Sequence, residues 1–211
     1  KAGIVKLVDR TFNYDDKRAC EIWQYLISSY AKKPFDTMFH FEISADILSE
    51  RAFEILRTAP AGIFRFECGV QSANSDVLKK VHRYSDLNKI LENIRRLSGQ
   101  GNIELHADLI AGLPGEDLSS IGRSYNEVYT SGAEMIQLGF LKVLKGSLLR
   151  KQALSLGIVY SDIPPYSVLS TPDISYMEIS LLRDIARMTG VYHNSGNFKF
   201  SLKYLVEHKY T

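Results

Sequence analysis

The 211-residue sequence predicts an α/β fold, namely a partial (β/α) TIM-type barrel with parallel strands followed by a helical C-terminal region. Segments rich in β-branched and aromatic residues begin at residues 4, 38, 63, 103 and 135, with amphipathic segments between most of them. This spacing is close to the roughly 31 residues per unit of a (β/α) barrel. Polar side chains interrupt the strands, which suits a ligand-holding barrel interior better than a sheet covered on both faces.

The first half of the chain alternates strands and helices. Strands are expected at residues 4–12, 37–44 and 63–70, and helices at residues 15–32 and 49–57. Apolar residues in 15–32 recur at 3.6-residue spacing and form one stripe, which predicts an amphipathic helix. Pro60 and Gly62 end the shorter helix, because neither residue continues a helix well.

The second half continues this alternation and then departs from it. A helix at 86–98, a strand at 103–113, a helix at 117–131 and a strand at 135–143 are expected. Beyond residue 144 we expect a helix at 146–157, a proline-containing loop at 160–173, a helix from Ser175 to about Met188 and a helix at 198–208. Ser175 and Glu178 form an S-x-x-E capping box, which marks a helix start. We therefore expect a barrel over residues 1–147 and a helical extension over 148–211.

Composition narrows the classes of function. With 26 Lys and Arg against 24 Asp and Glu, the net charge is only +2, which argues against a nucleic-acid partner. No apolar run approaches the roughly 18 residues that span a bilayer, so no membrane partner is expected. The two cysteines, Cys20 and Cys68, are too few for a disulfide framework, a structural zinc site or an iron–sulfur cluster. We expect a cytoplasmic protein without metal ligands of its own, and Lys1 in place of Met fits an excised segment.

Several segments together resemble a known family. Residues 69–74 (GVQSAN), 81–83 (VHR) and 108–116 (DLIAGLPGE) are similar to the middle and late strands of radical S-adenosylmethionine (radical SAM) enzymes. The nearest subset resembles the oxygen-independent coproporphyrinogen oxidase type and the cobalamin-binding radical SAM enzymes that share its barrel motifs. Residues 8–13 (VDRTFN) resemble the second-strand motif of the cobalamin-binding group, and the resemblance spans roughly residues 4–147.

The resemblance implies a barrel that binds S-adenosylmethionine against a [4Fe–4S] cluster, with polar residues around the methionine and ribose. Glu42 would lie near the methionine amino group, and Gln71 would contact the methionine or the ribose. Arg83 would hold the methionine carboxylate, and Asp108 would accept hydrogen bonds from the ribose hydroxyls. These residue types suit the ligand, because arginine binds carboxylates bidentately and ionised carboxylates only accept hydrogen bonds.

The resemblance also implies an adenine pocket. Ile110 would pack on the adenine ring, and the main chain around Leu141 and Lys142 would meet the adenine edge. An apolar rim of this kind completes a nucleoside pocket. No catalytic side chain is implied, because the cofactor carries the difficult chemical step.

One departure from the family is as informative as the match. The family's cluster is held by three cysteines in C-x-x-x-C-x-x-C, and this sequence contains no such motif. We therefore expect a C-terminal fragment of a radical SAM Fe–S oxidoreductase that acts on a small molecule, with the cluster loop in the missing N-terminal part of the same polypeptide. The fragment alone is expected to be inactive and, with a strand edge exposed, to self-associate. Whether the parent also binds cobalamin stays open.

Two other functions and several structural interpretations stay open at this point. The chain is alternatively a cluster-free barrel domain for nucleoside binding or scaffolding, or an aldolase-like barrel with Lys142 as a Schiff-base amine. Glu42 is equally explained by an ion pair with Arg65 inside the barrel. The histidines at residues 40, 82 and 106 share no metal-ligand spacing and are expected to be structural.

Overall fold

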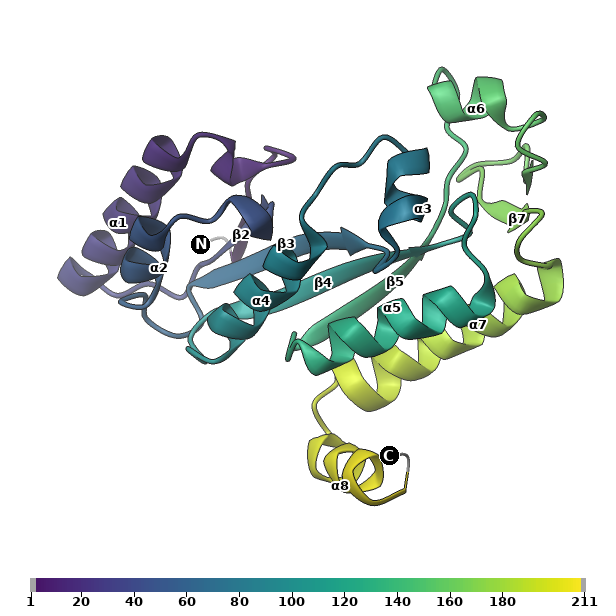
Figure 1. The fold of residues 1–211 in the computed structure, drawn as a ribbon. Coiled ribbons are helices and arrows are strands. Elements are labelled where there is room, and N and C mark those ends of the chain that lie inside the picture. The colour runs from purple at the N-terminus through teal and green to yellow at the C-terminus, as the bar shows by residue number, and fades with distance from the viewer. Residues whose placement is uncertain (1–2, 210–211) are drawn as a thin grey trace. The chain divides into compact units, whose positions relative to one another are not determined.

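The computed structural model describes residues 3–209 and contains one five-stranded sheet whose strands follow chain order, β1-β2-β3-β4-β5 (Figure 1). The strands are β1 (Ile4–Lys6), β2 (Met38–Ile43), β3 (Phe64–Gln71), β4 (Glu104–Ala111) and β5 (Met135–Phe140). The strands are parallel, as in the pairing of Lys6 with His40 and of His40 with Arg65. Parallel strands in sequential order need helical crossovers between them. The predicted α/β class with a partial parallel barrel is confirmed.

Helices separate the strands of the sheet and follow it. The α-helices are α1 (Asp16–Lys32), α2 (Glu50–Leu56), α3 (Ser75–Lys80), α4 (Leu87–Ser98), α5 (Leu118–Thr130), α6 (Leu148–Gln152), α7 (Tyr176–Thr189) and α8 (Lys199–Lys209). Short 3₁₀ turns lie at Phe12–Tyr14 and Ala45–Ile47, and a π-helical turn at Gly190–Asn194 follows α7. Side-chain caps fix several starts, since Asp15, Ser49 and Asp86 each accept a hydrogen bond from a backbone N–H of the first turn.

The chain divides into two compact units that both draw on the same strands. The first unit comprises the described residues up to Val70, Ser85–Ala107 and Val128–Met135. The second comprises Gln71–Tyr84, Asp108–Glu127 and the residues from Ile136 onward. The chain passes from one unit to the other within β3, β4 and β5, so the C-terminal ends of these three strands belong to the second unit. The predicted boundary between residues 147 and 148 stays a prediction.

Aromatic packing forms the core of the first unit. The single tryptophan, Trp23 on α1, is fully buried and lies 5.7 Å from Phe12, 6.2 Å from Phe41 and 5.5 Å from Phe66, measured between ring centroids. The 3₁₀ turn that follows β1 brings Phe12 into this cluster. The expected strand at residues 4–12 is therefore too long: β1 ends at Lys6.

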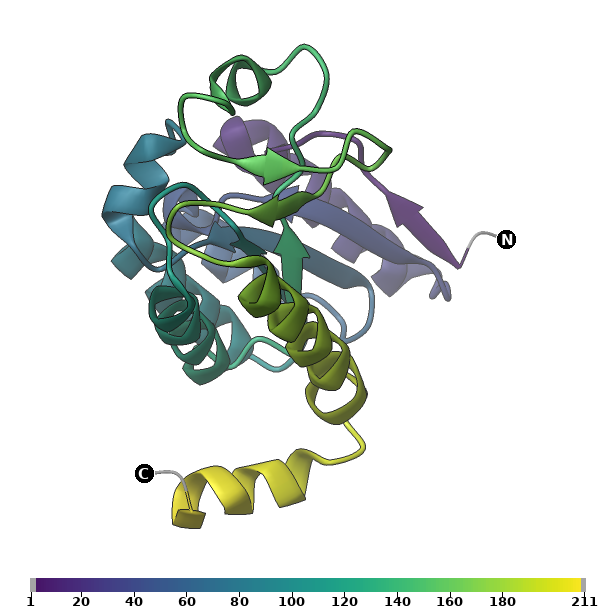
Figure 2. The same cartoon turned by 90° about the vertical axis from the view of Figure 1, so that its right-hand side faces the viewer.

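The second unit combines α3 and α5 to α8 with a small second sheet. The strands β6 (Val159–Tyr160) and β7 (Val168–Ser170) pair antiparallel, so the loop expected at residues 160–173 is wrong in part (Figure 2). The helices α5 and α7 run side by side, and Tyr125 Oη lies 2.9 Å from Thr189 Oγ1 (Figure 1). The expected capping box is confirmed, because Glu178 N–H donates to Ser175 Oγ and Ser175 N–H donates to Glu178 Oε2.

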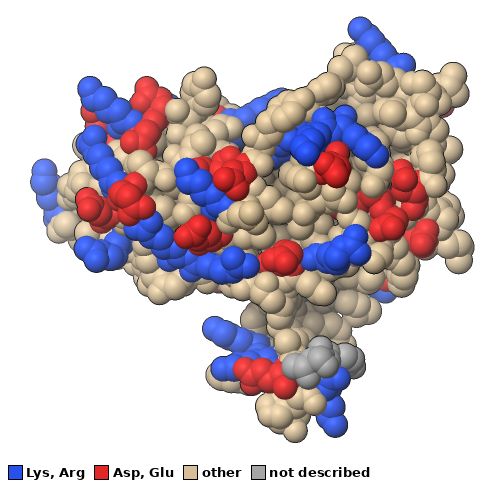
Figure 3. All heavy atoms as spheres, in the orientation of Figure 1, with Lys and Arg blue, Asp and Glu red and all other residues tan. Residues whose placement is uncertain are grey.

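Two properties of the surface bear on function. Among residues 3–209, no helix is both long and apolar enough to cross a membrane. On the face drawn in Figure 3, basic and acidic side chains are interspersed, as a net charge of +2 leads one to expect. The sequence did not predict α3, β6, β7 or the turns at Ala45–Ile47 and Gly190–Asn194, and each of these elements is six residues long or shorter.

Candidate functional site at the strand ends

Six of the seven residues predicted to bind the cofactor lie in the second unit, at or just beyond the C-terminal ends of three strands. They are Gln71 at the end of β3, Arg83 after α3, Asp108 and Ile110 on β4, and Leu141 and Lys142 after β5. Ligands of parallel α/β folds bind at this end of the strands. The remaining residue, Glu42 on β2, belongs to the first unit.

One cavity collects five of these six residues. The Asp108 cavity has a volume of about 430 Å³, within the range of small-molecule sites. Its lining residues are Gln71, Asp108, Leu109, Ile110, Gln137, Gly139, Phe140, Leu141 and Lys142. The cavity therefore places one carboxylate and two amide side chains beside apolar side chains from two strands.

Asp108 and Gln137 form the polar pair of this cavity. Gln137 Nε2 on β5 donates a hydrogen bond of 2.9 Å to Asp108 Oδ1 on β4. An ionised carboxylate only accepts hydrogen bonds, which is the property that binding of ligand hydroxyl groups requires. The sequence analysis gave Gln137 no role. The signal was available, because Gln137 and Gly139 alternate with the buried Ile136 and Leu138 and so face one side of the strand.

Some backbone groups of the main chain after β5 are hydrogen-bonded within the protein, and others face away from those partners. Leu141 N–H donates to Ala111 O (3.0 Å), and Leu141 O accepts from Val168 N–H (2.8 Å). Lys142 forms an antiparallel bridge with Ser167 whose hydrogen bonds are carried by the flanking residues, so its own N–H and C=O point away from that partner. Of the two residues predicted to meet an adenine edge, Lys142 is thus the one with main-chain groups left for a ligand.

A second cavity adjoins the first and is basic. The Arg83 cavity has a volume of about 500 Å³ and shares Gln71, Ile110 and Leu141 with the Asp108 cavity. Its other lining residues are Lys80, Val81, His82, Arg83, Leu113, Leu148, Leu149 and Gln152. Three of these carry basic side chains and none carries a carboxylate, so this cavity favours an anionic group. Sequence reasoning assigned Arg83 but missed Lys80, because α3 was not predicted.

Unusual backbone conformations shape the wall between the cavities. Gln71 has a φ of 70°, in the left-handed region that non-glycine residues rarely adopt. Gly112 has a φ of 85°, and a Cβ atom there would lie 2.6 Å from Val168 Cγ1 on β7. Glycine is required at residue 112 on both counts, because the left-handed backbone and the close approach of Val168 both exclude a side chain.

Glu42 has an ion-pair partner within the first unit. Lys6 Nζ lies 3.0 Å from Glu42 Oε1 and 3.3 Å from Glu67 Oε2, and the hydrogen bond that Lys6 donates to Glu42 is the largest cause of its raised pKa. The alternative pairing of Glu42 with Arg65 is wrong. Arg65 Nη2 instead lies 2.9 Å from Glu104 Oε1.

The histidines of the first unit are hydrogen-bonded to carboxylates, as the structural interpretation predicts. His40 Nε2 lies 2.8 Å from Glu67 Oε2, and His106 Nε2 lies 2.7 Å from Glu104 Oε1. Burial lowers the pKa of His40, although the Glu67 hydrogen bond opposes it. Burial alone would raise the pKa of Glu104, but hydrogen bonds from His106 and Arg65 outweigh it and hold the pKa below its ordinary value.

The chain does not hold the ligand set of an iron–sulfur cluster. Its two cysteines, Cys20 on α1 and Cys68 on β3, are free and buried thiols. Between residues 3 and 209 no group of three or more histidine, cysteine or acidic side chains is arranged to hold a metal ion. A [4Fe–4S] cluster of this type needs three thiolates, so the residues present do not fit it.

Comparison with known proteins gives two family matches. A family described as the radical SAM superfamily matches residues 7–128, and a family described as a protein of unknown function (DUF4080) matches residues 155–211. The chain is 36% identical to the heme chaperone HemW of Bacillus subtilis over 107 residues, 48% of this chain. It is 30% identical to the anaerobilin synthase of Escherichia coli O157:H7 over 120 residues, 57% of this chain. Each alignment covers 27% of the relative's length.

Solved structures show the same fold at low sequence identity. Coproporphyrinogen III oxidase (HemN) of Escherichia coli, described as a radical SAM enzyme, has a TM-score of 0.62 at 19% identity, over 90% of this chain and 41% of that one. The radical SAM methyltransferase TsrM of Kitasatospora setae, solved with cobalamin and a [4Fe–4S] cluster, has a TM-score of 0.60 at 13% identity. That match covers 77% of this chain and 34% of the TsrM chain.

Proposed function

Because this chain belongs to the radical SAM superfamily, we propose that its two adjoining cavities together bind S-adenosylmethionine for a larger radical SAM enzyme. The observation that carries this proposal is the meeting of Gln71, Asp108, Ile110, Leu141 and Lys142 around the Asp108 cavity. The sequence analysis selected these residues for one ligand, although up to 71 positions separate them.

The residues around the two cavities fit the parts of this ligand. Asp108 accepts hydrogen bonds from the ribose hydroxyls, while Gln137 holds its other side. Ile110 and Leu141 cover the faces of the adenine ring, and the main chain of Lys142 meets its polar edge. Arg83 binds the methionine carboxylate in the basic cavity that Lys80 and His82 also line.

The chemistry of the whole protein depends on residues beyond these cavities. A [4Fe–4S] cluster held elsewhere in the protein would supply the electron for reductive cleavage of S-adenosylmethionine, and Asp108 and Arg83 of this chain would hold the ribose and the methionine carboxylate. The two cysteines of this chain do not suffice as cluster ligands, so we infer that the rest of a longer polypeptide provides them. The chain alone is then inactive, and its contribution is to bind and orient the nucleoside.

Glu42 has the least support among the predicted residues. The Lys6 ammonium, 3.0 Å from Glu42 Oε1, competes with a methionine amino group for the same carboxylate. We infer that Glu42 contributes to the ion-pair network of the first unit and that the affinity for S-adenosylmethionine depends mainly on Asp108 and Arg83.

A direct test uses the whole protein reconstituted with iron and sulfide under anaerobic conditions. We expect an iron–sulfur absorption band and, with a reductant, conversion of S-adenosylmethionine to 5′-deoxyadenosine. Asp108→Ala should keep the absorption band and lose the product, because this residue binds the nucleoside and not the cluster. A cluster-loaded protein that forms no 5′-deoxyadenosine would contradict the enzymatic function.

The cysteine content favours a second candidate, a cluster-free domain that binds a nucleoside without radical chemistry. In that case this chain binds S-adenosylmethionine, while the whole protein acquires no absorption band on reconstitution. The two candidates therefore differ in the cluster and agree on the cavity.

A further inference from the structure

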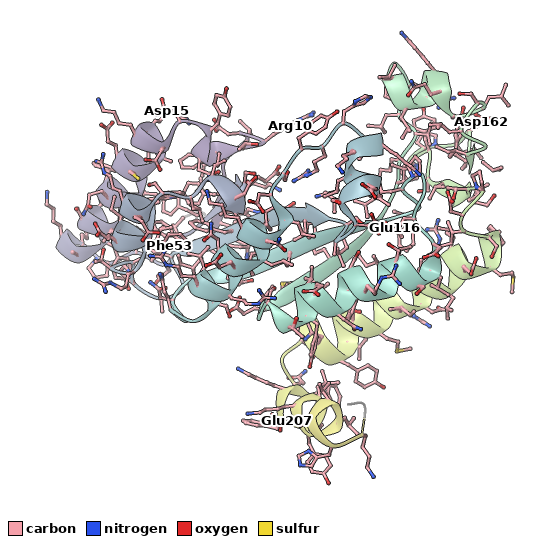
Figure 4. The ribbon with its side chains drawn as sticks, viewed as in Figure 1. Arg10, Asp15, Phe53, Glu116, Asp162 and Glu207 are labelled. Carbon is pink, nitrogen blue, oxygen red and sulfur yellow. The ribbon has the colours of Figure 1, made fainter. Side chains whose placement is uncertain are left out.

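A buried carboxylate that the proposed ligand does not touch lies next to the site. Glu116 is only 1% exposed and stands where the turn after β4 leads into α5, close to α3 (Figure 4). Its Oε1 atom accepts a hydrogen bond of 2.5 Å from Ser72 Oγ. Ser124 Oγ and Ser120 Oγ, both on α5, lie 3.4 Å and 3.5 Å from the same oxygen. Three hydroxyl groups from two segments therefore converge on one carboxylate oxygen.

These hydroxyl groups in turn hold the backbone that follows β3. Asn74 N–H donates to Ser72 Oγ (3.0 Å), and Ala73 N–H donates to Ser124 Oγ (2.8 Å). The Asn74 side chain also donates to Ser120 Oγ (3.3 Å). Through the serines, Glu116 thus links residues 72–74 to the first two turns of α5.

Burial of this carboxylate needs an explanation. Its Oε2 atom is buried without a hydrogen-bond partner among residues 3–209, and no basic side chain there forms an ion pair with it. Burial raises the pKa of Glu116, and the hydrogen bonds from Ser72, Ser124 and Ser120 only partly oppose this rise. A buried acid with one unsatisfied oxygen destabilises a fold, so a purely structural role is poorly served by it.

Gln71, the residue next to this hydrogen-bond network, lies in the wall of both cavities. Gln71 directly precedes Ser72, has a left-handed φ of 70° and lines the Asp108 cavity as well as the Arg83 cavity. Strained conformations of this kind persist only where the surrounding structure fixes them. The hydrogen bonds on Ser72, Ala73 and Asn74 fix the chain immediately after Gln71.

We propose that Glu116 is a positioning residue, which holds Gln71 in the wall shared by the two cavities by fixing residues 72–74 through Ser72 and Ser124. The inference rests on the proposed function in so far as S-adenosylmethionine is the ligand that Gln71 meets. Glu116 itself does not touch the ligand, since it lines neither cavity. The backbone of Glu116 also closes the turn after β4, because its N–H donates to the carbonyl oxygen of Leu113 (3.2 Å), a residue that lines the Arg83 cavity.

The first test needs no ligand and measures amide hydrogen exchange in this chain. Glu116→Ala removes the acceptor that the three serine hydroxyls share, so the amide of Asn74 should lose protection. The amide of Ala73 should lose less, because Ser124 keeps Ser120 O as a second acceptor (3.0 Å). Glu116→Gln keeps an acceptor oxygen and should therefore retain the protection of these amides. Ser72→Ala, which leaves Glu116 in place, should deprotect Asn74 as well. Unchanged exchange at Ala73 and Asn74 in folded Glu116→Ala would overturn the proposal.

The second test measures S-adenosylmethionine affinity by calorimetry for the same variants. We expect binding to Glu116→Ala to be weakened about tenfold and binding to Glu116→Gln to stay within about twofold of the original chain. Asn93→Ala is the control, because the buried Asn93 in the first unit donates to Ala45 O (2.7 Å) and lines neither cavity. It should lower stability and leave affinity unchanged.

The outcomes separate this inference from the proposed function. If the original chain binds S-adenosylmethionine and Glu116→Ala binds it equally well, the positioning role is wrong while the proposed function stands. If the original chain does not bind it, the proposed ligand is wrong, and the exchange of Ala73 and Asn74 still decides whether Glu116 fixes the turn. Equal weakening of Asn93→Ala and Glu116→Ala would assign the effect to stability and contradict the inference.

Discussion

Asp108 and Glu116 are two carboxylates of one strand–turn–helix segment with different surroundings. Asp108 is half-buried at a cavity, where the Gln137 side chain donates a hydrogen bond to it. Glu116 is enclosed by protein, and burial raises its pKa. The two residues are eight positions apart. The surroundings of Asp108 suit the binding of ligand hydroxyl groups, and those of Glu116 suit the fixing of the backbone.

Replacing Glu116 by glutamine should change how stability depends on pH. The folded-state pKa of Glu116 lies above its ordinary value of 4.5, so its ionisation favours the unfolded chain. The original chain therefore loses stability as the pH rises from about 4.5 through the folded-state pKa, and the neighbouring Asp117 carboxylate adds to this loss. Glu116→Gln has no such group, so its free energy of unfolding relative to the original chain should increase over that interval.

Urea unfolding monitored by circular dichroism at several pH values checks this prediction. The difference between the two proteins should be smallest near pH 4.5 and should grow toward neutral pH. A pH-independent difference would mean that Glu116 does not titrate differently in the folded and unfolded chains. Glu54→Gln on the exposed face of α2 is the matched control, because it makes the same substitution at an exposed carboxylate.

Individual site residues differ in how far the sequence could predict them. The sequence could predict Asp108, Ile110 and Gln71, because these residues lie in motifs at the ends of predicted strands. The roles of Gln137 and Glu116 depend on which strands and serines lie beside them after folding. Ser72, for example, is 44 positions from Glu116, and no local pattern links the two.

At the scale of elements, helices were predictable where caps and periodicity agree. Each helix start marked by Asp15, Ser49, Asp86 or Ser175 has that residue as its N-cap. The strands β6 and β7 were not predictable, because two or three residues are too few for a periodic pattern and two prolines lie between the strands. Their pairing depends on tertiary contacts. Val168 of β7 packs against Gly112, and Ser167, just before β7, forms an antiparallel bridge with Lys142 after β5.

The packing of α1 on the sheet should depend on the aromatic cluster. Phe12 is buried, and its ring centroid lies 4.5 Å from that of Phe41 and 5.7 Å from that of Trp23. Phe12→Ala should lower the free energy of unfolding by about 3–5 kcal/mol, because it leaves a large cavity. Fluorescence of the single tryptophan should also shift toward the red as Trp23 gains solvent.

An exposed aromatic residue on the same helix provides the control for this prediction. Tyr25 on α1 is 72% exposed, so Tyr25→Ala should change stability by no more than about 0.5 kcal/mol. Denaturant unfolding of both variants measures the two changes. Equal stability of Phe12→Ala and Tyr25→Ala would show that the cluster does not hold α1 in place.

At the scale of the whole molecule, the chain spans about a quarter of the length of the two curated relatives. We therefore propose the radical chemistry for a longer protein only, whereas the Asp108 cavity and the Arg83 cavity lie within this chain. A surface for association is also present, because α8 buries none of its residues and exposes Phe200, Tyr204, Leu205 and Val206. Apolar surface of this kind promotes association.

We predict that the isolated chain self-associates and that α8 contributes to this. Sedimentation velocity over a range of concentrations should show a rising weight-average mass. The double substitution Phe200→Ser and Tyr204→Ser should reduce this rise, because these side chains are 87% and 58% exposed on α8. Lys203→Ser is the matched control and should leave the association unchanged. A concentration-independent monomer would contradict the prediction.

Calorimetric titration of this chain with S-adenosylmethionine tests the central claim most directly. The account predicts saturable binding at one site, weakened at least about tenfold by Asp108→Ala because a charged acceptor for the ribose is lost. Asp162→Ala, an exposed carboxylate in the same unit that lines neither cavity, should bind as the original chain does. Absence of binding, or an affinity that Asp108→Ala leaves unchanged, would contradict the nucleoside site.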